Sequence, residues 1–224
     1  MPEGRVPHGC VGVLGSGEVG RSLARAFRGA GHDVMIGTRD TEKPDLREWL
    51  TGDGAAIKAG TFAEAAAHGD LIAVAVPGDA AESVIAAAGG PGAFGGKVVI
   101  DVMNPLDFSA GFPPGLFVSG DDSLGERVQR ALPDARVVKA FNIIGNAYFA
   151  HPSFPDGAPT MLIAGNDADA KGAVTGILAD FGWQDTIDLG GIECSRELEA
   201  ICSTWIKIAA KRGSFDHGFR VLTA

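Results

Sequence analysis

The sequence has too few cysteines for a disulfide framework and no apolar run long enough to span a membrane. Its three cysteines, Cys10, Cys194 and Cys202, form an odd, scattered set without zinc-ligand spacing, so we expect each to be a small buried apolar residue. We expect no signal peptide before Cys10. We therefore expect a protein of the reducing cytoplasm that does not enter a membrane.

An excess of positive charge is also absent. The chain has 19 Lys and Arg residues against 28 Asp and Glu residues, which gives a formal net charge of −9. A surface this acidic repels nucleic acid and anionic membranes, so we expect neither as a partner. An anionic ligand can still bind in a locally positive pocket.

What the chain does have is a regular alternation of short apolar runs and segments with helical spacing. The predicted strands cover residues 10–14, 33–37, 54–58, 71–76, 97–102, 136–141, 160–164 and 186–189. The predicted helices cover residues 19–29, 61–68, 80–88, 123–132, 167–181 and 196–211. This alternation predicts an α/β fold with a doubly wound, mostly parallel sheet, the Rossmann NAD(P)-binding fold. We expect one domain over residues 1–224, with a short C-terminal helical extension, residues 191–224, packed on it.

A glycine-rich turn lies between the first predicted strand and the helix that follows it. The turn reads Gly15-Ser16-Gly17-Glu18-Val19-Gly20. In this context Gly15 allows the tight turn, Gly17 lets the backbone approach a pyrophosphate, and Gly20 lets helix and strand pack closely. Free N–H groups at the start of the helix then face the phosphates. The turn therefore predicts a dinucleotide-binding βαβ unit.

The end of the second predicted strand indicates which dinucleotide binds. NAD enzymes place an acidic residue there for the ribose hydroxyls, whereas this chain has Thr38 and Arg39. Arg39 can hold a 2′-phosphate and Thr38 can donate its hydroxyl, so we favour NADP over NAD. If the strand ends one residue later, Asp40 takes the ribose role instead.

Two X-Pro pairs follow later strands, Val76-Pro77 and Asn104-Pro105. Ligands of open α/β sheets lie beyond the carboxyl ends of the strands, so these turns are expected to line the cleft near the nicotinamide. The alternative is that both prolines only end their strands. None of the five histidines lies in a catalytic motif. This absence disfavours alcohol dehydrogenation, which needs a proton donor, and favours hydride transfer to a flavin-like ring.

The glycine turn and several later motifs together resemble the F420-dependent NADP oxidoreductase family, whose relatives include the cytoplasmic domain of the STEAP metalloreductases. The later motifs are Gly37-Thr38-Arg39, Val76-Pro77, Asp101-Val102-Met103-Asn104-Pro105-Leu106, Val138-Lys139-Ala140-Phe141-Asn142 and Ser195-Arg196-Glu197-Leu198-Glu199. The resemblance implies hydride transfer between NADP(H) and a small-molecule electron carrier, F420 or a flavin. The residues that it implies in NADP binding are Gly15, Ser16, Gly17, Val19, Thr38, Arg39, Val76, Pro77, Asn104 and Ala140. It implies no catalytic side chain and no metal.

Two other functions stay open. One is an NADPH-dependent dehydrogenase or reductase of a small imine or hydroxy acid, and the other is an NADP(H)-sensing module without turnover. The apolar loop from Phe108 to Phe117 is predicted to act as a lid, with a static flap as the alternative. The apolar C-terminal helix predicts a homodimer.

Overall fold

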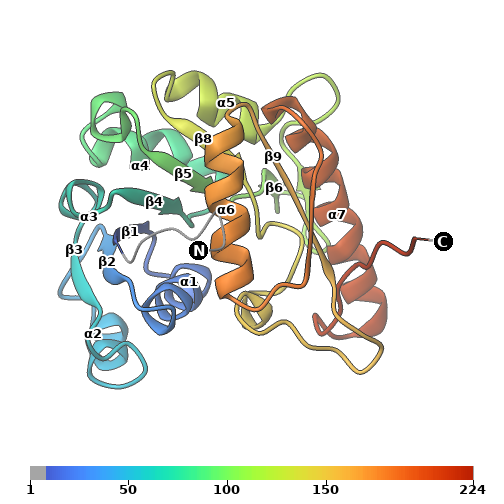
Figure 1. The fold of residues 1–224 in the computed structure, drawn as a ribbon, viewed down its shortest axis with the longest axis horizontal. Coiled ribbons are helices and arrows are strands. Elements are labelled where there is room, and N and C mark those ends of the chain that lie inside the picture. Colours follow the sequence, from blue (N-terminus) through green and yellow to red (C-terminus); the bar gives the residue numbers. More distant parts are fainter. Residues whose placement is uncertain (1–8, 224) are drawn as a thin grey trace.

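A computed structural model of the protein describes residues 9–223, and its centre is one eight-stranded sheet (Figure 1). The strands stand in the order β10-β9-β8-β5-β4-β1-β2-β3. They are β1 (Cys10–Leu14), β2 (Asp33–Thr38), β3 (Lys58–Thr61), β4 (Leu71–Val74), β5 (Val98–Asp101), β8 (Arg136–Lys139), β9 (Thr160–Gly165) and β10 (Asp185–Asp188). The six neighbouring strands β8, β5, β4, β1, β2 and β3 are parallel to one another. Strand β9 runs antiparallel to β8, and β10 is parallel to β9. The predicted mostly parallel Rossmann-like sheet is confirmed.

Helices cover both faces of this sheet. They are α1 (Glu18–Gly29), α2 (Pro44–Thr51), α3 (Phe62–His68), α4 (Ala81–Ala87), α5 (Leu124–Ala131), α6 (Ala168–Asp180) and α7 (Ser195–Arg212). Single 3-10 turns lie at Gly78–Ala80, Pro91–Phe94, Asn146–Tyr148 and Ile192–Cys194. Buried side chains of α1 and α6 pack into one core, and those of α3, α4 and α5 pack into a second core on the opposite face. The sheet is therefore doubly wound, as predicted.

Local side-chain contacts fix where two of these helices begin. Thr61 Oγ1 accepts a hydrogen bond from the Glu64 amide at 3.2 Å, and the Glu64 carboxylate accepts one from the Thr61 amide at 2.7 Å. Ser123 caps α5 in a similar way by accepting from the Glu126 amide at 3.1 Å. Each cap satisfies an amide that the first turn of a helix leaves unpaired.

Three local predictions were wrong. The strand predicted at residues 54–58 begins only at Lys58, because Gly54 packs against the Trp49 ring and residues 52–56 form turns instead. Helix α2 was not predicted, although Pro44 opens it and Leu46 anchors it in the core. No strand or helix was predicted between residues 102 and 123, yet this stretch contains a short antiparallel ribbon of β6 (Leu106–Asp107) and β7 (Gly115–Leu116).

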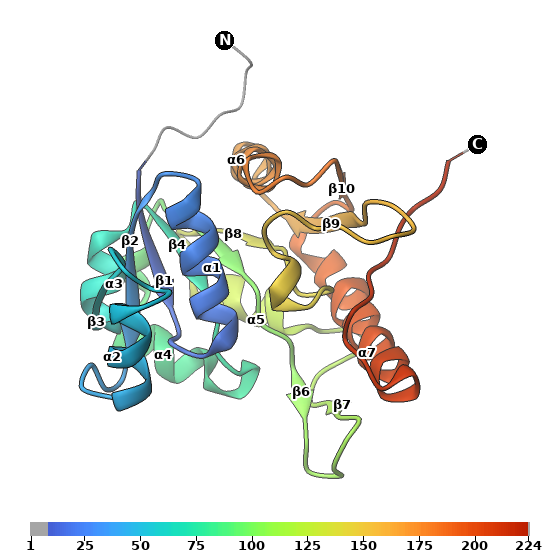
Figure 2. The ribbon, with the colours of Figure 1, turned by 90° about the horizontal axis from the view of Figure 1, so that it is seen from below.

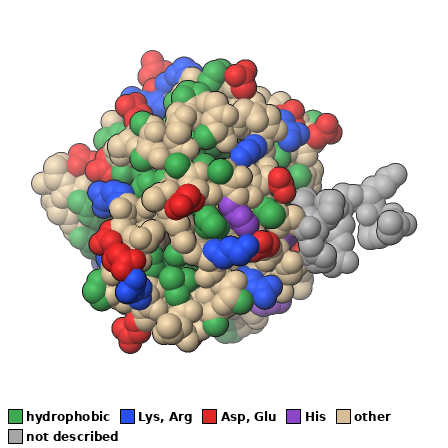
Figure 3. Space-filling view, turned by 90° about the vertical axis from the view of Figure 1, so that its left-hand side faces the viewer, with side chains coloured by type: hydrophobic (Ala, Val, Ile, Leu, Met, Phe, Trp, Pro, Cys, Tyr) green, Lys and Arg blue, Asp and Glu red, His purple; other side chains and the backbone are tan. Residues whose placement is uncertain are grey.

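The C-terminal helix α7 packs at the end of the sheet that carries β9. Helix α7 contacts α5 and β9, and the β6–β7 ribbon projects from the fold next to it (Figure 2). Within residues 9–223 no helix is both long enough and apolar enough to cross a bilayer. On the face that carries β3 and α2, acidic and basic side chains are interspersed rather than gathered into one patch (Figure 3). Cys202 is buried as expected, whereas Cys10 and Cys194 are only half-buried, which corrects that prediction.

Candidate active site

The glycine-rich turn joins β1 to α1 and has the geometry that its sequence predicts. Gly15 adopts φ of +129°, and its amide donates to the Gly37 carbonyl at 3.0 Å. A Cβ on Gly20 would lie 1.8 Å from the Gly15 carbonyl oxygen, so only glycine lets the helix approach the strand here. A Cβ on Gly17 would meet no atom within 4 Å. The space above Gly17 is open, as a backbone that contacts a pyrophosphate requires.

Polar side chains stand beside this turn at the end of β2. Ser16 and Thr38 are joined by a hydrogen bond of 3.0 Å between their hydroxyl oxygens. Strand β2 ends at Thr38, one residue later than predicted, so Arg39 is the first residue beyond it and Asp40 the second. Arg39 is exposed and forms no hydrogen bond or ion pair with any other residue in 9–223. The Asp40 carboxylate instead accepts from the Glu42 amide at 2.9 Å and closes a turn.

A cavity of about 580 Å³ opens next to the glycine turn, at the carboxyl ends of β1, β4 and β5. It is lined by Gly17, Glu18, Val19, Ala75, Val76, Pro77, Gly78, Asp79, Val102, Met103, Asn104, Leu106 and Phe108. Its position matches the ligand crevice of open parallel sheets. The turn, its open backbone and this cavity together fit a dinucleotide.

A second cavity of about 370 Å³ adjoins the first and reaches toward α7. The two cavities share Glu18, Val19, Val102, Asn104 and Leu106. The second is otherwise lined by Phe141, Asn142, Ile144, Gly145, Asn146, Phe149, Cys202, Trp205, Ile206 and Phe215. It is therefore mostly apolar and aromatic, as a site for a flat ring is expected to be.

An asparagine pair forms the floor between the cavities. The Asn104 amide donates to the Asn142 carbonyl at 3.0 Å, and the Asn142 amide donates to Asn104 Oδ1 at 2.9 Å and to the Leu198 carbonyl at 3.1 Å. Asn142 Oδ1 is buried and has no hydrogen-bond partner among the described residues. This oxygen can accept a hydrogen bond from a ligand N–H group.

Beneath this floor lies a buried charge cluster that the sequence reasoning missed. Lys139 Nζ lies 2.8 Å from Asp101 Oδ2, 2.9 Å from Glu199 Oε1 and 2.8 Å from the Met103 carbonyl oxygen. Glu199 in turn accepts from the amides of Leu124 and Gly125, both at 3.0 Å, at the start of α5. The cluster therefore ties β5, β8, α5 and α7 together directly under Asn104.

Electrostatics keep Lys139 charged in this cluster. Burial by itself lowers the pKa of Lys139, but the carboxylates of Asp101 and Glu199 outweigh it and raise the pKa above the ordinary value. Glu199 also faces the positive end of the α5 dipole. A signal was present in the sequence: Asp101 and Lys139 are charged residues inside apolar strands, a pattern that requires a buried partner.

Most of the residues predicted to bind NADP lie around the larger cavity, but Ala140 does not. Gly17, Val19, Val76, Pro77 and Asn104 line the larger cavity. The residues of the adjoining turn and strand end are Gly15, Ser16, Thr38 and Arg39. Ala140 lines neither cavity, since it is fully buried and its amide pairs with the Asp101 carbonyl. The next two residues, Phe141 and Asn142, do line the second cavity.

The predicted lid, Phe108 to Phe117, follows β6 directly and includes β7. Phe108 and Phe112 are each 59% exposed. Phe108 lines the larger cavity, and the Phe112 ring contacts the Phe215 ring edge-on, with centroids 6.5 Å apart. The loop thus lies at the mouths of both cavities, and its movement stays a prediction.

Few ionisable groups face the two cavities. Those in the linings are Glu18, Asp79 and Cys202, and no histidine, lysine or tyrosine is among them. Burial raises the pKa of Cys202 to about 12, so its thiol stays neutral.

The fold and the glycine turn define a Rossmann-type dinucleotide-binding protein. A family model described as "NADP oxidoreductase coenzyme F420-dependent" matches residues 10–105. The F420-dependent NADP reductase of Methanothermobacter marburgensis is 30% identical over 220 residues, which cover 94% of this chain and 97% of that protein. The chain therefore belongs to the F420-dependent NADP oxidoreductase family, as its motifs predicted, and is an oxidoreductase.

Two further similar proteins show how far the similarity extends. A crystal structure from Arthrobacter sp. FB24, assigned as an F420-dependent NADP reductase, has 37% sequence identity and a TM-score of 0.88, and the match covers 95% of this chain and 99% of that one. The metalloreductase STEAP3 of Rattus norvegicus is 31% identical over 192 residues, 85% of this chain. The match spans 36% of STEAP3, so that protein contains much that this chain does not match.

Proposed function

We propose that the protein transfers a hydride between NADP(H) and F420, or a flavin-like carrier. The observation that carries this proposal is the pair of adjoining cavities, one beside an open glycine turn and one lined by aromatic residues. Bound NADPH supplies the hydride, and the carrier ring takes it up with a proton from water, which leaves NADP⁺ and the reduced carrier. The two rings would meet where the cavities share Val19 and Asn104.

The chain's own groups would bind and orient the two ligands. The amides around Ser16 and Gly17, at the start of α1, face the pyrophosphate. Arg39 and Thr38 hold the 2′-phosphate, and the absence of any other partner for Arg39 within residues 9–223 leaves its guanidinium ready for it. Val19, Val76, Pro77 and Asn104 shape the nicotinamide end. Ala140 acts only by placing Phe141 and Asn142.

The second cavity would orient the carrier and exclude water. Trp205 and Phe215 offer ring faces, and the unpaired Asn142 Oδ1 can accept from a ring N–H. Direct hydride transfer needs orientation and a dry cleft, and it needs no proton donor on the protein. The lack of a histidine, lysine or tyrosine in either lining fits this reaction better than alcohol or imine reduction.

We further propose that the protein acts in the cytoplasm, as a single domain over residues 1–224 with its extension at 191–224, and as a homodimer. Support for the dimer is the apolar surface after α7, where Phe215, Val221 and Leu222 are exposed. Sedimentation that finds only monomer at micromolar concentration would refute the dimer.

The function is tested by mixing the protein with NADPH and either F420 or FMN, and by following absorbance. We expect turnover with at least one carrier and a preference for NADPH over NADH. In an Arg39→Ala variant, NADPH affinity is expected to fall about 10- to 100-fold, the effect of losing a charge-assisted hydrogen bond, while NADH affinity is unchanged. Arg28→Ala, an exposed arginine at the far end of α1, is the matched control.

The outcomes separate the alternatives. No turnover with either carrier, together with tight NADPH binding, would support a sensing module. Turnover only with imines or hydroxy acids would support the small-substrate reductase. Equal losses of NADPH and NADH affinity in Arg39→Ala would refute the role of Arg39.

A further inference from the structure

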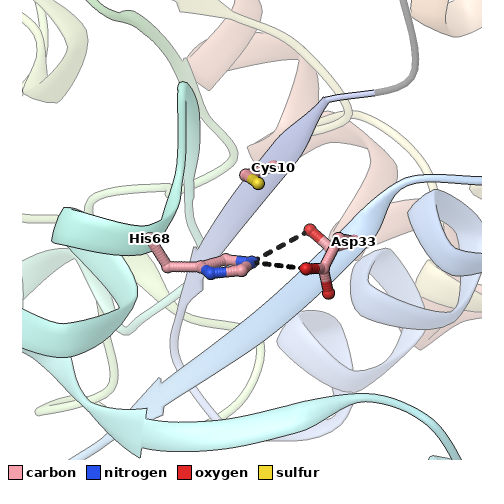
Figure 4. Close-up of side chains that lie close together, drawn as sticks. All are labelled: Cys10, Asp33 and His68. Carbon is pink, nitrogen blue, oxygen red and sulfur yellow. Dashed lines mark hydrogen bonds and ion pairs between the residues drawn. The ribbon is translucent and has the colours of Figure 1, made fainter.

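A second group of reactive side chains lies at the opposite edge of the sheet from the proposed active site. Cys10 is the first residue of β1, Asp33 is the first residue of β2, and His68 is the last residue of α3. One donor atom of each side chain lies within 4.8 Å of the other two. Figure 4 shows the three side chains converging on one point, His68 directed at Asp33 with Cys10 beside them.

The backbone holds these three residues in place. Cys10 and Asp33 are register partners on neighbouring parallel strands, so their side chains lie on the same face of the sheet. Helix α3 packs against this face so closely that a Cβ on Gly12 would lie 2.2 Å from the Ala65 carbonyl oxygen. His68, one turn after Ala65, is therefore fixed over the ends of both strands.

From this geometry we propose that Cys10, Asp33 and His68 form a binding site for a divalent transition metal, zinc by preference. A thiolate, an imidazole and a carboxylate are the three donor types that zinc takes, and three protein ligands with one water complete a tetrahedral shell. Donor atoms on such an ion lie about 3.3–3.7 Å apart, so the side chains must close by only about 1 Å. Nothing in the proposed hydride transfer uses this group.

The contacts of His68 show what the ion would replace. His68 Nε2 lies 3.2 Å from the Asp33 carbonyl oxygen and 3.8 Å from Asp33 Oδ2. The ion would take the lone pair of this nitrogen in place of its hydrogen bond to the Asp33 backbone. The proposed metal would thus fasten β1, β2 and α3 at the edge where the sheet begins.

Neighbouring cations oppose binding, Lys58 most directly and Arg28 more weakly. Lys58 Nζ, on β3, lies 2.7 Å from Asp33 Oδ2. A carboxylate can bind a metal while it accepts a hydrogen bond from a second group, which is common around metal sites. The lysine charge nevertheless lowers the affinity for a cation, so removing it should strengthen binding.

The test is a titration of reduced, metal-stripped, tag-free full-length protein with Co²⁺, followed by Zn²⁺ competition. We expect one equivalent of Co²⁺ to bind with a thiolate-to-cobalt charge-transfer band, and Zn²⁺ to displace it and raise the melting temperature. The band should vanish in Cys10→Ser, and the affinity should fall at least about tenfold in His68→Gln. Lys58→Gln should bind more tightly than the wild type.

Cys194→Ser is the matched control, because Cys194 is another half-buried free cysteine. It should keep the full band. NADPH binding by each variant reports that the fold is intact, since the cofactor cleft lies at the other edge of the sheet. Absence of a charge-transfer band in the wild type, or a band that survives Cys10→Ser and is lost in Cys194→Ser, would overturn the proposal.

Discussion

The part of the chain up to β5 and the part after it build their halves of the site by different means. In the first, backbone atoms determine the shape: the Gly15 amide pairs with Gly37, and the Gly20 backbone packs on the Gly15 carbonyl. In the second, buried side chains do so, with Lys139 bonded to carboxylates from β5 and α7. The shape of the dinucleotide cavity therefore depends on glycines that lack side chains. The shape of the second cavity depends on buried charged side chains.

This difference predicts different responses to mutation. A side chain added to the glycine turn clashes with the few atoms around it, so its effect is local. A buried ion cluster fails through desolvation, since loss of one member leaves the others charged without a partner. Three predictions test the contrast, in order of decreasing expected effect.

The largest effect is expected for Lys139→Met. This change leaves Asp101 and Glu199 facing each other without a cation, so the free energy of unfolding should fall by about 3–5 kcal/mol. Lys171→Met is the control, because Lys171 pairs with a half-exposed Asp188 near the surface and should lose about 1 kcal/mol or less. Urea denaturation measures both. Equal losses in the two variants would contradict the special role of the cluster.

The second prediction separates two glycines of the same turn. Gly17→Ala should leave the melting temperature of the free protein almost unchanged, because the added Cβ meets no atom, but it should weaken NADPH binding at least about tenfold by blocking the pyrophosphate. Gly20→Ala should lower the melting temperature itself, because the Cβ would overlap the Gly15 carbonyl. Thermal unfolding and NADPH titration check both variants. An unchanged NADPH affinity in Gly17→Ala would refute the proposal that the pyrophosphate binds against the Gly17 backbone.

The smallest effect concerns the ion pair that links α5 to α7. Arg196 holds both carboxylate oxygens of Glu126, and its hydrogen bond keeps the pKa of Glu126 below the ordinary value. A lowered pKa contributes stability above the unfolded value, about 4.3, and that stability is lost as the pH falls through the folded pKa. We expect about 1 kcal/mol from this pair.

The measurement is the free energy of unfolding between about pH 5 and pH 3. Glu126→Gln should show a shallower fall over this range than the wild type. Asp45→Asn, which removes a more exposed partner of Arg21, is a suitable comparison. Parallel curves for wild type and Glu126→Gln would show that the pair contributes nothing.

The same contrast explains how far the sequence could be interpreted. The glycine turn, the strand–helix alternation and the caps at Thr61 and Ser123 follow from local rules, and the structure confirms them. Family motifs also pointed to Asn104, although not to its hydrogen bonds with Asn142. Structures formed by residues close together in the sequence can therefore be predicted from residue spacing.

Contacts between residues far apart in the sequence could not be predicted from these local rules. Asp101, Lys139 and Glu199 come from three distant segments, and only the fold brings them together. Ala140 was predicted to contact NADP from its motif, and the motif does not show that this residue is fully buried directly after β8. The Cys10, Asp33 and His68 group has no ligand spacing along the chain, so the sequence predicted only buried, inert cysteines. In each case the missing information was the order of strands in the sheet.

The central claim is that a hydride passes directly from one cavity to the other. The most direct test uses NADPH carrying deuterium at C4, on each face in turn, with F420 as the carrier and mass spectrometry of the reduced product. The account predicts that deuterium from one of the two faces appears on carbon in reduced F420 and none is released to water. Deuterium in the solvent, or unlabelled reduced F420 from both labelled forms, would contradict direct transfer between the two cavities.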